Sequence, residues 1–174
     1  FWFFAITAVP LAQVFALEFT APLWATLLAV FILGERITGF RAATLLVGFV
    51  GILIVTRPWI EPLGWGVAAG ALAAVGFAVS AVFTRLLSRS VSITTILFWL
   101  TMMQAAFGVL TAGIDGDIAW PSTAMWPWVA LVAVAGLVAH FCLTRALSLA
   151  PAAVVMPVDF ARLPVIALIG MWLY

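Results

Sequence analysis

The sequence predicts an all-α protein, a polytopic bundle of transmembrane helices. Hydrophobic residues make up 67% of the chain and charged residues only 7%, whereas a water-soluble domain has about 25% charged residues. Apolar stretches long enough to cross a hydrocarbon core of about 30 Å recur along the chain. The period-two alternation of membrane strands is not found in the sequence. These observations favour helices in lipid.

Short polar connectors divide the chain into apolar segments. We expect a helix end over residues 1–8 and full spans over 10–33, 40–56, 63–87, 94–113 and 125–147, then a last segment from 150 to the end. A crossing helix needs roughly 20 apolar residues, which most of these spans provide. Both termini fall within hydrophobic runs, and we therefore expect the chain to be part of a longer one.

The charges in the connectors are sorted between two faces of the predicted bundle. One face carries five arginines: Arg36, Arg41, Arg85, Arg89 and Arg145. The other carries three acids, Glu61, Asp115 and Asp117, and five tryptophans, Trp59, Trp65, Trp120, Trp126 and Trp128. The positive-inside rule makes the arginine-rich face cytoplasmic, and tryptophans gather at membrane interfaces. The pattern predicts a multi-pass integral membrane protein.

Charge and motif content exclude several classes of function. Six acids nearly cancel seven bases, and the bases are spread singly, which argues against nucleic acid as a partner. Cys142 is the single cysteine and the chain has one histidine, which excludes an intrachain disulfide and a His-rich metal centre. The sequence contains no phosphate loop, HExxH or GxSxG motif. We therefore predict no enzyme activity, no cofactor and no metal site.

A segment near the start of the chain recurs near its end, at a constant offset of 141 residues. Residues 5–19 and 146–160 share five identical positions, Pro10 is matched by Pro151, and Glu18 is matched by Asp159. An odd number of connections separates the copies, so they enter the membrane from opposite faces. Inverted repeats are typical of secondary transporters, whose substrate site lies near the midplane between the halves.

Two motifs resemble a known family. The run from Pro22 to Thr38, PLWATLLAVFILGERIT, resembles the signature that closes the fourth helix of EamA-domain proteins, which belong to the drug/metabolite transporter superfamily. Residues 157–164, PVDFARLP, resemble the ninth helix of the same family. The resemblance covers nearly the whole chain. It implies ten helices in two inverted halves, alternating access, and export of small metabolites across a bacterial inner membrane.

The resemblance also divides the chain and implies its partners. Residues 1–56 correspond to the C-terminal part of the first repeat, with the end of helix 3 and helices 4 and 5. Residues 63–174 correspond to most of the second repeat, helices 6 to 9, and a second Gly-Glu pair would fall just beyond Tyr174. Expected partners are a small-molecule substrate, the lipid bilayer and the missing helices of the same polypeptide, and a homo-oligomer is left open.

Glu18 is the first candidate for a substrate-binding site. It lies about 12 Å into its helix, counted from Pro10 at 1.5 Å per residue, where an ionisable side chain costs roughly 2.5–3.5 kcal/mol. Pro22 cannot donate an N–H to the carbonyl of residue 18, and a carboxylate there could receive a cation, a proton or a substrate ammonium. The face expected to point into the bundle holds Glu18, Pro22, Ala25, Thr26 and Ala29. A purely structural role is the alternative.

Asp159 and Arg162 form the second candidate site. Their i, i+3 spacing places them on one helix face, where they could neutralise each other or form a charged cavity wall with Arg162 facing a substrate carboxylate or phosphate. Pro157 and Pro164 bracket the pair and are expected to kink the helix. We predict that Glu18 and Asp159 lie on opposite walls of one cavity.

The remaining candidates are single polar residues and a helix end. His140 and Gln13 could bind substrate, or could bond a neighbouring carbonyl and hold helices together. Gly34 is expected to adopt a left-handed cap, and Glu35 to organise the turn that follows, by pairing with an arginine for example. We assign Pro22, Gly34, Glu35, Pro157 and Pro164 to structural or gating roles.

A stripe of small residues is predicted where one helix packs closely against another. Gly66, Gly70, Ala74 and Ala78 are spaced by four, as expected where a helix packs closely against a neighbour.

The alternative to a transporter is a membrane-embedded sensor or assembly subunit that moves no solute. The sequence leaves this alternative open, because the helices of such a protein would pack by the same physics. Solute flux distinguishes the two.

Overall fold

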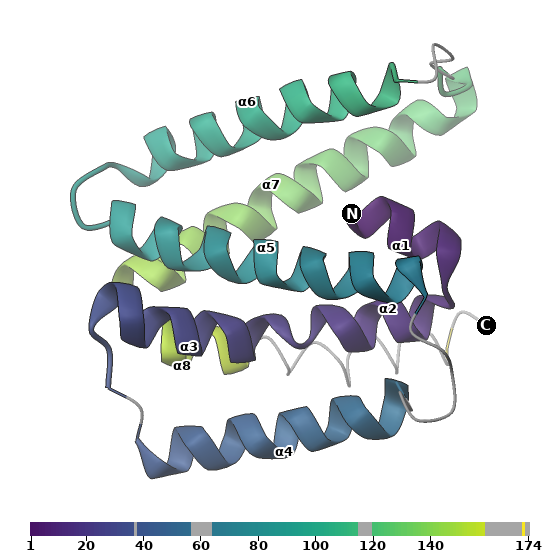
Figure 1. Ribbon diagram of the computed structural model, residues 1–174. Coiled ribbons are helices and arrows are strands. Elements are labelled where there is room, and N and C mark those ends of the chain that lie inside the picture. Colours follow the sequence, from purple (N-terminus) through teal and green to yellow (C-terminus); the bar gives the residue numbers. More distant parts are fainter. Residues whose placement is uncertain (37, 57–63, 115–119, 159–171, 173–174) are drawn as a thin grey trace. The chain divides into compact units, whose positions relative to one another are not determined.

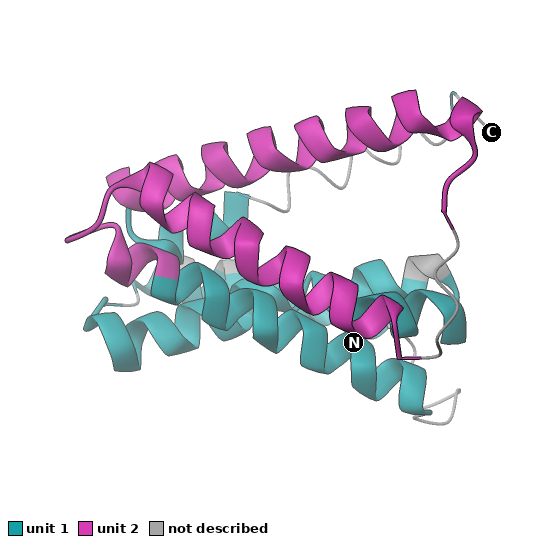
Figure 2. Cartoon of the chain, turned by 90° about the horizontal axis from the view of Figure 1, so that it is seen from above, with its two compact units in different colours: residues 1–83, 150–174 teal, residues 84–149 magenta. Residues whose placement is uncertain are grey.

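The computed structural model describes residues 1–36, 38–56, 64–114, 120–158 and 172, and all regular structure in these ranges is helical (Figure 1). The chain divides into two compact units, one of Phe1–Phe83 with Ala150–Tyr174 and one of Thr84–Leu149 (Figure 2). Within the described residues, four helical stretches are long and apolar enough to cross a membrane: Gln13–Leu33, Trp65–Leu87, Ile93–Ala112 and Thr123–Leu149. The predicted fold class, a bundle of apolar helices, is confirmed.

The helix bounds follow the predicted spans closely. The helices are α1 (Trp2–Ala8), α2 (Leu11–Glu18), α3 (Ala21–Leu33), α4 (Gly39–Thr56), α5 (Trp65–Leu87), α6 (Ile93–Ala112), the short 3-10 helix η1 (Thr123–Met125), α7 (Trp126–Leu149) and α8 (Ala152–Val158). One difference is clear. The span predicted over residues 10–33 is two helices, α2 and α3, rather than one.

Two prolines account for the breaks around α2. Val9 is extended, at φ −139° and ψ 159°, as a residue before proline prefers, and Pro10 then caps α2. Pro22 lies in the first turn of α3, the part of a helix where its missing N–H is tolerated. The Thr20 hydroxyl donates to the carbonyl of Leu17 at 2.7 Å within the intervening turn. Pro22 therefore begins a new helix.

Four of the five residues predicted to share an inward face belong to α3, whereas Glu18 ends α2 and is only partly buried. Pro22, Ala25, Thr26 and Ala29 are all buried, and α3 packs against α8 and α4. The hydroxyl of Thr26 donates to the carbonyl of Pro22 at 2.8 Å, so this buried polar group is satisfied inside its own helix. Small side chains along this face let α8 approach closely, as expected for helices that associate in lipid.

The small-residue stripe of α5 packs against α1 and α2. An added Cβ at Gly66 would lie 2.7 Å from the Cβ of Ala8, and one at Gly70 would lie 2.8 Å from a methyl of Leu17. Ala74 and Ala78, further along the stripe, are fully buried. The stripe is therefore a close helix contact within the first unit, in agreement with its predicted packing role.

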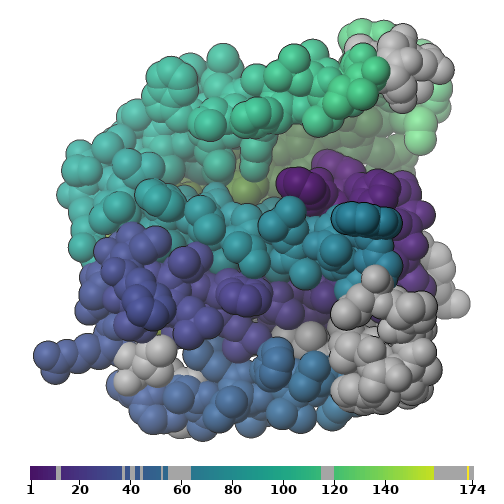
Figure 3. Space-filling view, in the orientation of Figure 1, coloured from purple at the N-terminus to yellow at the C-terminus, as the bar shows by residue number. Residues whose placement is uncertain are grey.

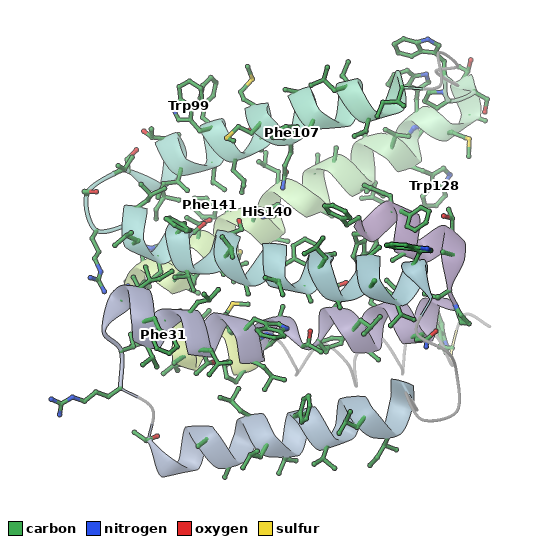
Figure 4. The ribbon with its side chains drawn as sticks, in the orientation of Figure 1. Phe31, Trp99, Phe107, Trp128, His140 and Phe141 are labelled. Atoms are coloured by element: carbon green, nitrogen blue, oxygen red, sulfur yellow. The ribbon has the colours of Figure 1, made fainter. Side chains whose placement is uncertain are left out.

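The second unit consists mainly of α6 and α7, which contact each other and expose large apolar side chains. Trp99 is 60% exposed and projects from α6 (Figure 4), and the side chains of α6 are open to view along the helix in Figure 3. Trp126 and Trp128, at the start of α7, are also exposed. Exposed apolar surface on this scale is typical of protein that contacts lipid or other helices.

Arg85 fixes the end of α7. Its guanidinium Nη1 donates to the carbonyl of Leu147 at 2.6 Å, between the last turn of α5 and the last turn of α7. The last four carbonyls of a helix have no N–H partner within the helix, and a cation at this end is favourable. Arg85, assigned by the sequence to a connector at the arginine-rich face, thus joins two helices there.

Gly34 ends α3 in the predicted left-handed conformation, at φ 67° and ψ 24°. We expect Gly34→Ala to lower the free energy of unfolding by about 1 kcal/mol, because a Cβ in this conformation meets its own backbone. No other atom lies within 4 Å of the added Cβ, so the cost is one of conformation alone. Thermal unfolding in detergent measures it. Gly39→Ala is the control, since Gly39 has equal space and no positive φ, and an equal loss there would refute this reading.

Candidate functional site

The carboxylate of Glu18 lies where α2 ends. The indole Nε1–H of Trp2 donates to Oε2 of Glu18 at 2.9 Å, because the turn at Val9 and Pro10 folds α1 back along α2 and brings the start of one helix to the end of the other. Both side chains are partly buried. An acid within a span thus has a hydrogen-bond donor beside it, which lowers the cost of its burial.

Gln13 lies in a different place from Glu18, although both belong to α2. It lines a surface pocket of about 520 Å³ at the turn between α1 and α2 and at the start of α5. The other residues of this pocket are Phe4, Ala8, Val9, Pro10, Gly64, Trp65, Gly66 and Val67. Gln13 is the one amide side chain in this lining, which is otherwise mostly apolar.

Glu35 contacts a distant helix. Its Oε1 accepts a hydrogen bond from the N–H of Ala152, and its Oε2 accepts one from the N–H of Ala153, each at 3.1 Å. The turn after α3 therefore meets the start of α8, and since α3 packs along α8, the two helices run in opposite directions. The helix that follows Pro10 and the helix that follows Pro151 begin at opposite ends of the first unit, as an inverted repeat predicts.

The other predicted site residues belong to the second unit, to α8 or to the part of the chain outside the described residues. His140 belongs to α7 in the second unit (Figure 4). Pro157 lies inside α8, and Asp159, Arg162 and Pro164 lie outside the described residues, so the predicted pairing of Glu18 with Asp159 across one cavity stays a prediction. Among the described residues, no three His, Cys, Asp or Glu side chains gather as metal ligands would.

Two side-chain hydrogen bonds were not predicted from the sequence. Trp2 is not among the predicted site residues, and Arg85 was predicted only as a charge in a connector. The signal for Trp2 was available, because a partly buried indole N–H usually has an acceptor and Glu18 is the acid nearest to Trp2 in sequence. The signal for Arg85 was weaker, since nothing local points to a carbonyl at Leu147, 62 residues away.

The chain is similar in sequence to known transporter proteins. Residues 1–57 and 64–174 match the sequence model described as the EamA-like transporter family. The riboflavin transporters of Rhizobium johnstonii and Brucella anthropi are 35% and 31% identical to this chain, over 99% and 97% of it. The S-adenosylmethionine uptake transporter of Rickettsia bellii is 24% identical over 99% of the chain. The chain spans 57%, 61% and 59% of the lengths of these three relatives. No solved structure matches it.

Proposed function

The chain belongs to the EamA-like transporter family, and from this premise we propose that the protein moves a small heterocyclic metabolite across a bacterial inner membrane by alternating access. Residues 1–56 and 63–174 would form parts of two inverted repeats, the first with the end of helix 3 and helices 4 and 5, the second with helices 6 to 9. The antiparallel course of α3 and α8 supports this division.

The single observation that carries the proposal is the position of Glu18. It is an acid within an apolar span, at the break between α2 and α3, and α3 packs against α8. Ionisable residues inside membranes are rare and mark substrate or ion pathways. Interrupted helices near the midplane are where secondary transporters bind their substrates. Glu18 would line the substrate path, with Asp159 and Arg162 on the opposite wall.

The contact with Trp2 supports a particular class of substrate. The carboxylate accepts a hydrogen bond from a ring N–H on a flat aromatic system, and a heterocyclic substrate with a ring N–H could replace the indole in the same geometry. Two similar relatives are named riboflavin transporters, and riboflavin is a flat heterocycle of this kind. We therefore propose riboflavin or a close analogue as the substrate.

Flux measurement tests the proposal. The protein, expressed from its complete reading frame and reconstituted in proteoliposomes, is expected to carry saturable riboflavin flux above that of empty liposomes. S-adenosylmethionine serves as the second substrate, because a relative is named for its uptake. Loading either side of the membrane gives the direction, for which the sequence predicted export. Absence of flux for both compounds would refute transport of this class and favour the sensor or assembly role.

A further inference from the structure

The carboxylate of Glu35 and the amides of Ala152 and Ala153 form a contact that we call the Glu35 cap. The N–H groups of Ala152 and Ala153 are the first two of α8, and such groups have no acceptor within their own helix. Pro151, which precedes them, has no side-chain oxygen to serve as a local cap. Glu35, 117 residues before Ala152 in sequence, supplies this acceptor, and its charge suits the positive end of a helix.

The cap is held firmly on the α3 side. The left-handed conformation of Gly34 turns the chain sharply after α3, and the N–H of Glu35 donates to the carbonyl of Ala29 at 3.2 Å. The N–H of Gly34 donates to the same carbonyl, so both residues that follow α3 are hydrogen-bonded to its last turns. Ala29 is fully buried on the face of α3 that packs with α8. The backbone of Glu35 is therefore fixed to the same helix that contacts the start of α8.

We infer that Glu35 is a positioning residue for transport, which holds the start of α8 against the end of α3 while the arginine-rich face is closed and releases it when that face opens. The inference rests on the proposed function, because α3 and α8 would belong to different repeats. Alternating access moves one half of the transporter against the other. A contact between the halves at one side of the membrane is therefore made in only one of the two access states. α8 leads in sequence directly to Asp159 and Arg162, two of the residues predicted to bind substrate.

A buried thiol can report the release. The Ala153 side chain is 1% exposed and the Ala5 side chain on α1 is 0% exposed, so a cysteine at either position is protected in the capped state. The exposed Cys142 is first replaced by serine. In the complete protein in proteoliposomes, Glu35→Gln is expected to raise the rate of maleimide alkylation of Ala153→Cys about tenfold, because the amide loses charge-assisted bonds, and to leave that of Ala5→Cys unchanged.

Control variants distinguish release of the Glu35 cap from a general loosening of the protein. A parallel flux measurement distinguishes it from failure of the proposed transport function. Glu61→Gln changes the net charge equally and is expected to leave both alkylation rates as they were. Ala152→Cys, at another fully buried position of α8, is the second reporter. An unchanged rate at both α8 reporters, or an equal rise at Ala5→Cys, would overturn the inference. Riboflavin flux is measured in the same vesicles, so a protein that carries none refutes the proposed function while alkylation still tests the cap.

Discussion

Replacing Gly66 with leucine is expected to destabilise the protein by about 3 kcal/mol, the largest structural effect that we predict. A Cβ at this position would lie 2.7 Å from the Cβ of Ala8 and 2.9 Å from Cγ1 of Val9. The Ala8 Cβ cannot rotate away, because it is attached directly to the backbone of α1. The overlap therefore forces α1 and α5 apart, which overpacked helix contacts resist at a cost of about 1–3 kcal/mol or more.

Two further glycines of α5 make this prediction specific. Gly76 is exposed and has no atom within 4 Å of an added Cβ, so Gly76→Leu is expected to leave stability unchanged or raise it slightly through helix propensity. Gly70→Ala is expected to cost less than Gly66→Ala, because the atom it meets is a terminal methyl of Leu17. The midpoint of thermal unfolding in detergent ranks the variants by stability. Equal midpoints for Gly66→Leu and Gly76→Leu would show that the close contact is not made.

The second large effect is expected in transport. Glu18→Gln in the complete protein is predicted to lower the initial rate of riboflavin flux on the order of tenfold to a hundredfold, because the neutral amide no longer offers a charged acceptor to a substrate N–H or a proton. The side chain keeps its shape, so insertion and folding should be preserved. The amount of folded protein in the vesicles is measured alongside the flux.

Trp2→Phe separates a substrate role for Glu18 from a structural one. This variant removes the indole N–H that Glu18 accepts but leaves the carboxylate in place. If Glu18 acts on the substrate, Trp2→Phe changes flux only a fewfold and Glu18→Gln much more. If the two variants lower flux equally, the hydrogen bond between the two residues is what matters, and Glu18 loses its proposed role in the substrate path.

Much of the fold was predictable because it depends on local sequence. The bounds of α5, α6 and α7 follow from apolar length and polar connectors, and the left-handed cap of Gly34 follows from a glycine at a helix end. The inward face of α3 follows from residues spaced by three and four. The break between α2 and α3 was only half predicted. Pro22 was expected to disturb the helix, yet hydropathy does not register a turn as short as Phe19 and Thr20 within a long apolar run.

The contacts of the candidate site were less predictable because they join distant parts of the chain. Glu35 was placed correctly at the end of its helix, but its partners are backbone N–H groups of α8, and every residue carries such groups. Arg85 likewise binds a backbone carbonyl. A sequence shows which side chains need partners. It does not show which backbone groups three-dimensional packing will bring to them.

The Glu35 cap bears on how a protein of this kind could have arisen. Suppose that the two repeats descend from a single shorter chain that once paired with its own copy. The acid that now caps a helix of the other repeat would then have capped a helix of the other subunit. Each subunit would have completed its neighbour, so neither would have been fully stable alone. Fusion of the two genes would then have turned that mutual dependence between molecules into a contact within one.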